Sequence, residues 1–159
     1  MGHPGVPADD DPGGGDDGGQ LQRGGPAGEH HVLGQPGARG DGERELARAV
    51  AEGAGLGEEA VLAGRTTSLE LAAVLAAARV VVCGDTGVAH LATAYRRPSV
   101  VLFGPVSPAL WGPPRRRQHV VLWHGDGAGD PWGTELDPAL DEVTVDEVSE
   151  ALDDLLARL

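Results

Sequence analysis

A short polar turn between two apolar runs carries residue types that could hold an anion. Its members are Gly84, Asp85, Thr86, Gly87 and His90. They follow the apolar run 80–83 and open a helical stretch, so we expect them where a strand ends and a helix begins. The first N–H groups of a helix have no intrahelical acceptor and lie at the positive end of its dipole. A phosphate or diphosphate would suit that environment.

Each residue type has a role at such a turn. Gly84 and Gly87 lack a Cβ, so the backbone there could approach a ligand closely. Asp85 has the short acceptor side chain of a helix N-cap, and the Thr86 hydroxyl could reach a phosphate oxygen. His90 lies four residues after Thr86 and therefore on the same helical face. Spacing alone leaves a structural alternative open, in which Asp85 only caps the helix and His90 is a core histidine.

The elements that must position this turn alternate between helix and strand. We expect helices at 42–54, from the Thr67 cap through the apolar run 71–78, at 86–95 and after Thr144, and strands at 59–63, 80–83, 99–103 and 119–123. The strands are continuous apolar runs, which is typical of a parallel sheet buried on both faces. The predicted fold class is therefore α/β, a Rossmann-like parallel sheet of about four strands with helices on both faces. In such sheets, ligands bind outside the carboxyl ends of the strands.

Local signals add detail to this arrangement. Two capping boxes are predicted, Thr67 with Glu70 and Thr144 with Glu147. The first helix carries a narrow apolar stripe made of Leu46, Ala49, Val50 and Ala54. Segment 106–118 is predicted to be a loop and 125–143 to be irregular. Core or packing roles are predicted for Tyr95, Trp123 and Trp132.

Composition limits the domain organisation and the class of function. Residues 1–40 are rich in Gly and Pro and poor in large aliphatic side chains, so we predict a disordered leader before one domain at 41–159. The net charge of −13 disfavours a nucleic-acid partner, because such binders need a basic face. We predict no transmembrane segment and no signal peptide, hence a cytoplasmic location. Cys83, the single cysteine, is expected to pack in a strand rather than react.

Several motifs follow one another in a fixed order. They are Asp85-Thr86-Gly87, His90, Ala92 and Ala94, Pro98, Phe103-Gly104-Pro105 and Trp111-Gly112-Pro113. This ordered set resembles the C-terminal signature of glycosyltransferase family 9, the ADP-heptose:lipopolysaccharide heptosyltransferases and their relatives. The upstream segments "GERELARAV" and "GRTTSLELAAVLAAARVVV" are also similar to family segments. The resemblance covers about residues 41–115.

The resemblance implies a domain that binds a nucleotide-diphosphate sugar, such as an ADP-sugar, for transfer to a lipopolysaccharide core or another cell-surface glycan. Carried over by position, the donor diphosphate and sugar would contact Gly84, Asp85, Thr86, Gly87 and His90. Glu43 matches an acidic residue that reaches the ribose, with Glu45 as a competitor, and Gly104, Pro105 and Trp111 are candidate pocket walls. The family's transfer inverts the anomeric centre. It needs no metal or other cofactor, because backbone amides and the helix dipole stabilise the leaving diphosphate.

Family enzymes also have an N-terminal Rossmann-like domain, which binds the acceptor and supplies the carboxylate that deprotonates it. We therefore expect no catalytic residue in this chain, little transferase activity of the chain alone, and an association with the inner face of the membrane. The acceptor domain would be on a separate chain, or lost by truncation or a misread frame. Two other functions stay open, a non-catalytic nucleotide-binding module and a nucleotide-sugar epimerase. Arg115–Arg117 could approach an anionic donor or acceptor, or form a solvated loop.

Overall fold

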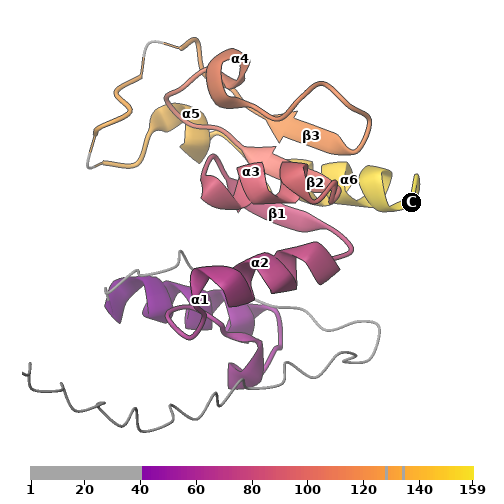
Figure 1. The fold of residues 1–159 in the computed structure, drawn as a ribbon. Helices are drawn as coiled ribbons and strands as arrows, with labels where there is room; N and C mark the ends of the chain where they lie inside the picture. Colours follow the sequence, from indigo (N-terminus) through magenta and orange to yellow (C-terminus); the bar gives the residue numbers. More distant parts are fainter. Residues whose placement is uncertain (1–40, 128, 134) are drawn as a thin grey trace, which may run out of the picture.

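The computed structural model describes residues 41–127, 129–133 and 135–159 of the chain, and the predicted leader at 1–40 lies outside them. In chain order the elements are α1 (Asp41–Gly53), the 3-10 helix η1 (Glu58–Ala60), α2 (Ser68–Ala77), β1 (Val81–Gly84), α3 (Gly87–Ala94), β2 (Ser99–Leu102), α4 (Pro108–Trp111), β3 (His119–Leu122), α5 (Pro138–Asp141) and α6 (Val145–Leu156) (Figure 1).

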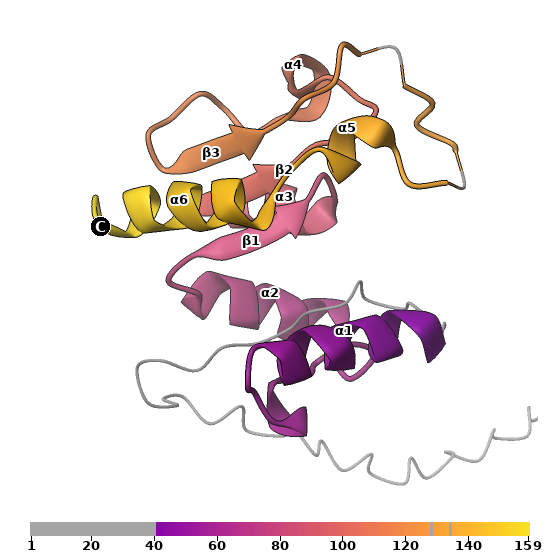
Figure 2. The ribbon, with the colours of Figure 1, turned by 180° about the vertical axis from the view of Figure 1, so that it is seen from behind.

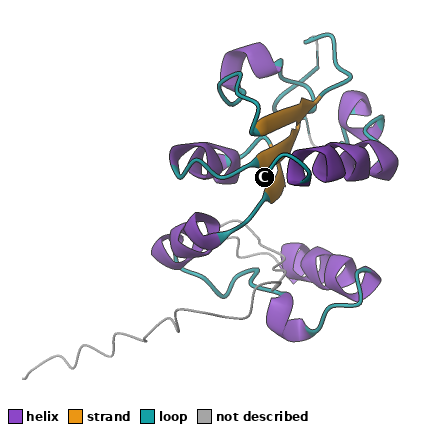
Figure 3. Ribbon diagram, turned by 90° about the vertical axis from the view of Figure 1, so that its right-hand side faces the viewer, coloured by secondary structure: helices purple, strands orange, loops and turns teal. Residues whose placement is uncertain are grey.

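The three strands form one parallel sheet in the order β1-β2-β3. Helix α3 packs on β1 and β2, whereas α6 packs on β2 and β3. Figures 1 and 2 show α3 and α6 on opposite faces of the sheet, and Figure 3 shows helices on both sides of the strands. The predicted Rossmann-like α/β class is therefore confirmed. Coverage is incomplete at β1, where the side chain of Val82 is 44% exposed.

The central strand β2 is covered by other parts of the protein on both of its faces. Ser99, Val100 and Val101 of β2 are completely buried, as expected for a strand covered on both faces. On the α3 side, Val101 packs with Phe103 and Ala89.

The capping boxes of α2 and α6 are both present, which confirms the predicted starts of these helices.

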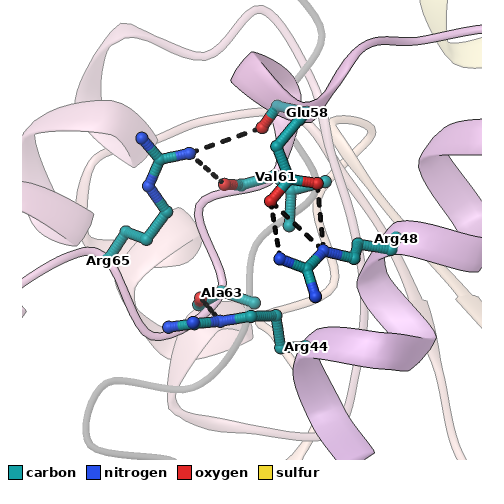
Figure 4. A network of polar contacts seen from close by, with 6 residues as sticks. All are labelled: Arg44, Arg48, Glu58, Val61, Ala63 and Arg65. Carbon is teal, nitrogen blue, oxygen red and sulfur yellow. Dashed lines mark hydrogen bonds and ion pairs between the residues drawn. The ribbon is translucent and has the colours of Figure 1, made fainter. Parts of the chain in front are cut away.

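The predicted strand at 59–63 is not formed as a continuous strand, and only Val61 makes a single β-bridge. Glu58–Ala60 forms η1 instead, and three arginine side chains surround this segment (Figure 4). Arg65 Nη1 lies 3.4 Å from the carbonyl oxygens of Glu58 and Val61, and Arg44 Nε donates to Ala63 O at 3.3 Å. Guanidinium groups thus take carbonyl oxygens that a strand would offer to a neighbouring strand.

Helix α1 faces this segment with its small residues. Ala47 and Ala51 are buried against Val61 and Ala63. Leu46, by contrast, is 66% exposed. The predicted stripe of Leu46, Ala49, Val50 and Ala54 is therefore wrong, since all four are exposed. Alanine lets the helix approach the chain closely, and tertiary packing decides which face turns inward.

Some side chains and loops also differ from expectation. Tyr95, at the C-cap of α3, is exposed rather than in the core, and the side chain of Trp132 is 89% exposed rather than packed. The short helices α4 and α5 lie in segments predicted to be irregular. Each begins with a capping side chain followed by a proline, Ser107-Pro108 and Asp137-Pro138, and this pair of residue types favours the start of a helix.

A partly buried polar pair joins the amino ends of β2 and β3. His119 Nδ1 lies 2.9 Å from Ser99 Oγ, and its Nε2 lies 3.3 Å from Gln118 Nε2. The neutral tautomer with its proton on Nδ1 satisfies both contacts, since Nε2 can then accept from Gln118. Burial, and then the nearby Arg116 charge, lower the pKa of His119.

This pair predicts acid sensitivity of the fold. Because the pKa of His119 is lower in the folded chain, the unfolded chain binds more protons in acid. The contribution is complete above the unfolded pKa of about 6.5 and is lost as pH falls toward the folded value. Denaturant midpoints should fall as the pH drops below about 6.5, and the fall should be smaller in His119→Asn. His90→Asn, on the exposed face of α3, is the control. Equal pH dependence of wild type and His119→Asn would contradict the assignment.

Candidate functional site

The carboxyl ends of the three strands meet at one edge of the sheet. The N–H of Asp85 donates to Leu102 O at 3.0 Å, and the N–H of Phe103 donates to Leu122 O at 2.9 Å. Each strand is thus still paired with its neighbour as the chain leaves the sheet. Figure 2 shows β1 and β3 pointing toward the side where α4 and α5 lie. The predicted turn at Gly84–Gly87 opens at this edge.

Thr86, not Asp85, caps helix α3. Its backbone is extended (φ −144°, ψ 175°), and its Oγ1 accepts from the N–H of Val88 at 3.3 Å. The predicted N-cap role of Asp85 is therefore wrong. The reason is that the N–H of Asp85 still pairs with β2, so the helix begins one residue later. The Thr86 hydroxyl keeps its proton free to donate to a ligand.

Asp85 and His90 form the titratable part of the turn. The Asp85 side chain is half-buried, and His90 is exposed on the first turns of α3. Burial raises the pKa of Asp85, and the charge of His90 opposes that rise. The two groups are therefore close enough to interact. Because Asp85 does not cap the helix, its carboxyl can accept a hydrogen bond from a ligand hydroxyl.

The glycines of the turn meet almost nothing in the protein. A Cβ built on Gly87 has no heavy atom within 4 Å, and one on Gly84 lies 3.9 Å from Leu102 O. Neither residue has a positive φ. The fold does not require glycine at either position, so the space in front of α3 is open to a ligand.

The remaining predicted ligand contacts lie after β2, at the end of α4 and in the first turn of α1. Gly104 is buried immediately beyond β2, and Pro105 is half-buried beside it, as a pocket wall at this edge would require. Trp111 ends α4 with its side chain 61% exposed. Glu43 is half-buried in the first turn of α1, and Glu45 is exposed. The choice between them as a ribose contact stays a prediction.

The carboxyl end of β3 adds residues that were not predicted to belong to the site. Trp123 donates from Nε1 to Gly104 O at 3.0 Å. His124 Nε2 lies 2.9 Å from Glu147 Oε1, whose carboxylate also belongs to the capping box of α6. Hydrogen bonding by Thr144 and the charge of His124 lower the pKa of Glu147. The rule that placed the turn, that ligands sit beyond strand carboxyl ends, could have identified this segment too.

Among residues 41–127, 129–133 and 135–159, no cluster of His, Cys, Asp and Glu has the composition of a metal site.

The described part of the chain also contains no helix long and apolar enough to cross a membrane. Arg115, Arg116 and Arg117 are all exposed, as in a solvated loop. Burial, and then the Asp85 charge, raise the pKa of Cys83 to about 11.

Comparison with known proteins connects this geometry to one family. Residues 30–129 match the model of Glycosyltransferase family 9 (heptosyltransferase). Lipopolysaccharide heptosyltransferase 1 of Pseudomonas aeruginosa is 46% identical over 76 residues, which are 48% of this chain and 21% of that protein. Lipopolysaccharide heptosyltransferase 2 of Escherichia coli is 32% identical over 101 residues, which are 61% of this chain and 29% of that protein.

A solved structure is similar as well. The structure of the E. coli ADP-heptose lps heptosyltransferase II aligns with a TM-score of 0.59 at 28% identity, covering 79% of this chain and 35% of that chain. The chain therefore spans about a third of that structure. It spans 21% and 29% of the two curated relatives.

The state of Cys83 gives a direct chemical prediction. Since its pKa is raised to about 11, its thiolate fraction near pH 8 is about a hundredfold below that of an ordinary thiol. A disulfide reagent should label the native chain about a hundredfold more slowly than the chain in guanidinium. Equal rates in the two states would contradict the burial of this thiol.

The open space at Gly87 predicts that the fold tolerates a side chain there. Gly87→Ala should keep or slightly raise the thermal midpoint, because alanine favours the helix by up to about 1 kcal/mol. The matched control is Gly112→Ala, whose Cβ would collide with Pro108 O. That variant should lose about 1–3 kcal/mol. A large loss in Gly87→Ala would mean that the fold, and not a ligand, requires this glycine.

Proposed function

The chain belongs to glycosyltransferase family 9, the heptosyltransferase family, and from this premise we propose that its strand-end edge binds a nucleotide-diphosphate sugar. The sugar is transferred to a lipopolysaccharide core or a related cell-surface glycan. The observation that carries the proposal is the turn from β1 into α3. It combines glycines that face open space, a threonine hydroxyl that can still donate, and the side chains of Asp85 and His90 at the positive end of a helix.

The donor diphosphate lies against the first N–H groups of α3. The Thr86 hydroxyl donates to a phosphate oxygen, and the ligand fills the open space beside Gly84 and Gly87. The exposed His90 imidazole on the first turns of α3 presents a ring N–H to the diphosphate or the sugar, and the Asp85 carboxyl accepts from a sugar hydroxyl. Glu43 accepts from the ribose hydroxyls in this assignment.

The same groups supply the electrostatic part of the transfer. Negative charge grows on the diphosphate as the bond to the sugar breaks, and the helix N-terminus and His90 stabilise that charge. This assignment needs no metal ion. The base that takes the proton of the acceptor hydroxyl is placed outside residues 41–159, on an acceptor-binding part that works together with this one.

Calorimetric titration of the full chain with ADP, UDP and GDP tests the donor site. We expect saturable binding of one nucleotide, unchanged by EDTA. Asp85→Asn and His90→Ala should each weaken it about tenfold or more, as expected for lost charge-assisted hydrogen bonds. Gly87→Ala should weaken it with the thermal midpoint retained, because its methyl group enters the ligand's space. Gly53→Ala, with equally open surroundings at the end of α1, is the control.

The outcomes separate the rival functions. A folded chain that binds none of the three nucleotides contradicts the proposal, and so does full-strength binding by Gly87→Ala. A nucleotide sugar that binds more tightly than its free nucleotide supports a transferase donor site, whereas equal affinities favour a non-catalytic nucleotide-binding module. Turnover by this chain alone, with donor and lipid-linked acceptor, would contradict the placement of the base on a part outside this chain.

A further inference from the structure

The segment that begins at Trp123, at the end of β3, packs against the loop that follows β2. The loop comprises residues 104–107, and its first carbonyl oxygen, Gly104 O, accepts from Trp123 Nε1 at 3.0 Å. The Trp123 ring is half-buried and packs against the buried cluster of Ala89, Val101 and Phe103. Trp123 therefore joins the sheet core to a backbone oxygen of the loop.

Glycines bring the two segments together. A Cβ on Gly125 would collide with the indole nitrogen of Trp123 and lie 3.2 Å from Gly104 O. A Cβ on Gly129 would lie 2.7 Å from the Cα of Pro105. These separations are too short for a side chain, so the chain after β3 can lie on the loop only with glycine at both positions.

Helix α5 and its N-cap also lie close to the start of the loop. A Cβ on Gly104 would lie 3.4 Å from Leu140 Cβ and 3.6 Å from Asp137 Cβ. Asp137 is itself fixed as the N-cap of α5, because its Oδ1 accepts from the N–H of Ala139 at 3.0 Å. The start of the loop thus lies close to Trp123 and Gly125 and also to α5.

The 104–107 loop lies next to the candidate site. Leu102 O accepts from the N–H of Asp85, and Gly104 follows Leu102 by only two residues. A shift of the loop would therefore change the wall next to the turn that opens α3.

We propose that Trp123 is a positioning residue for the donor site, acting through the hydrogen bond that fixes the 104–107 loop. This inference rests on the proposed function. It goes beyond a packing role, because packing depends on the ring, whereas positioning depends on the indole N–H. The ring and the N–H can be separated by mutation.

The variants Trp123→Phe and Gly125→Ala disturb the same contact in different ways. The first keeps an aromatic ring but removes the donor, and the second pushes a methyl group against the indole nitrogen. Trp132→Phe is the matched control, since Trp132 is highly exposed. Amide hydrogen exchange and nucleotide titration are measured on the full chain for all three variants and the wild type.

We expect faster exchange at Gly104, Val106 and Ser107 in both test variants, with exchange at Val100 and Val101 of β2 unchanged. The dissociation constant for the bound nucleotide should rise about three- to tenfold, as for one lost hydrogen bond. Trp132→Phe should match the wild type in both measurements.

Unchanged loop exchange in Trp123→Phe would overturn the inference. Faster exchange throughout β2 and the loop would also overturn it, because that pattern indicates a packing role alone. So would an unchanged dissociation constant in a variant whose loop exchanges faster. If the wild-type chain binds no nucleotide, the proposed function fails, and the exchange data alone decide whether Trp123 holds the loop.

Discussion

The in-register parallel pairing of β1, β2 and β3 is the constraint on which the rest of the molecule depends. It aligns Gly84, Leu102 and Leu122, so that all three strands end at the same level. Pairing continues one residue further, through the N–H groups of Asp85 and Phe103. Because these backbone groups remain bonded to the neighbouring strand, the chain turns into α3 only at Thr86. The helix N-terminus is thereby held beside the loop that follows β2.

The glycines at this edge fall into two physical groups. Gly125 and Gly129 lie where a Cβ would strike a ring or a backbone, so the packing of the protein itself accounts for them. Gly87 faces open space and has an ordinary backbone conformation, and packing offers no reason for it. A glycine that the fold does not need, at the start of a helix, is most simply explained by a ligand that approaches the backbone there.

The part of the chain before α2 is organised by a different interaction. Its small core is separate from the clusters around the sheet. Arg48 binds Glu58 with three contacts of 2.9–3.2 Å, and two further arginines hold carbonyl oxygens of the segment after η1 (Figure 4). The chain has only 12 basic residues against 25 acidic ones. Three of the basic residues therefore serve to fix the segment around η1. The exposed pair is weakened by water and salt, so the buried alanines carry more of the stability there.

The sequence by itself determined the parallel sheet, the capping boxes and the turn between β1 and α3, because apolar runs, Thr-x-x-Glu spacing and glycine act over a few neighbouring residues. It also determined the family, through an ordered set of short motifs. Only the tertiary structure decided which face of α1 is buried, that residues 59–63 do not join the sheet, and that Thr86 replaces Asp85 as the cap. It alone brought Trp123 to Gly104, 19 residues away. These outcomes depend on which distant group competes for each backbone atom or apolar face, and no local pattern records that competition.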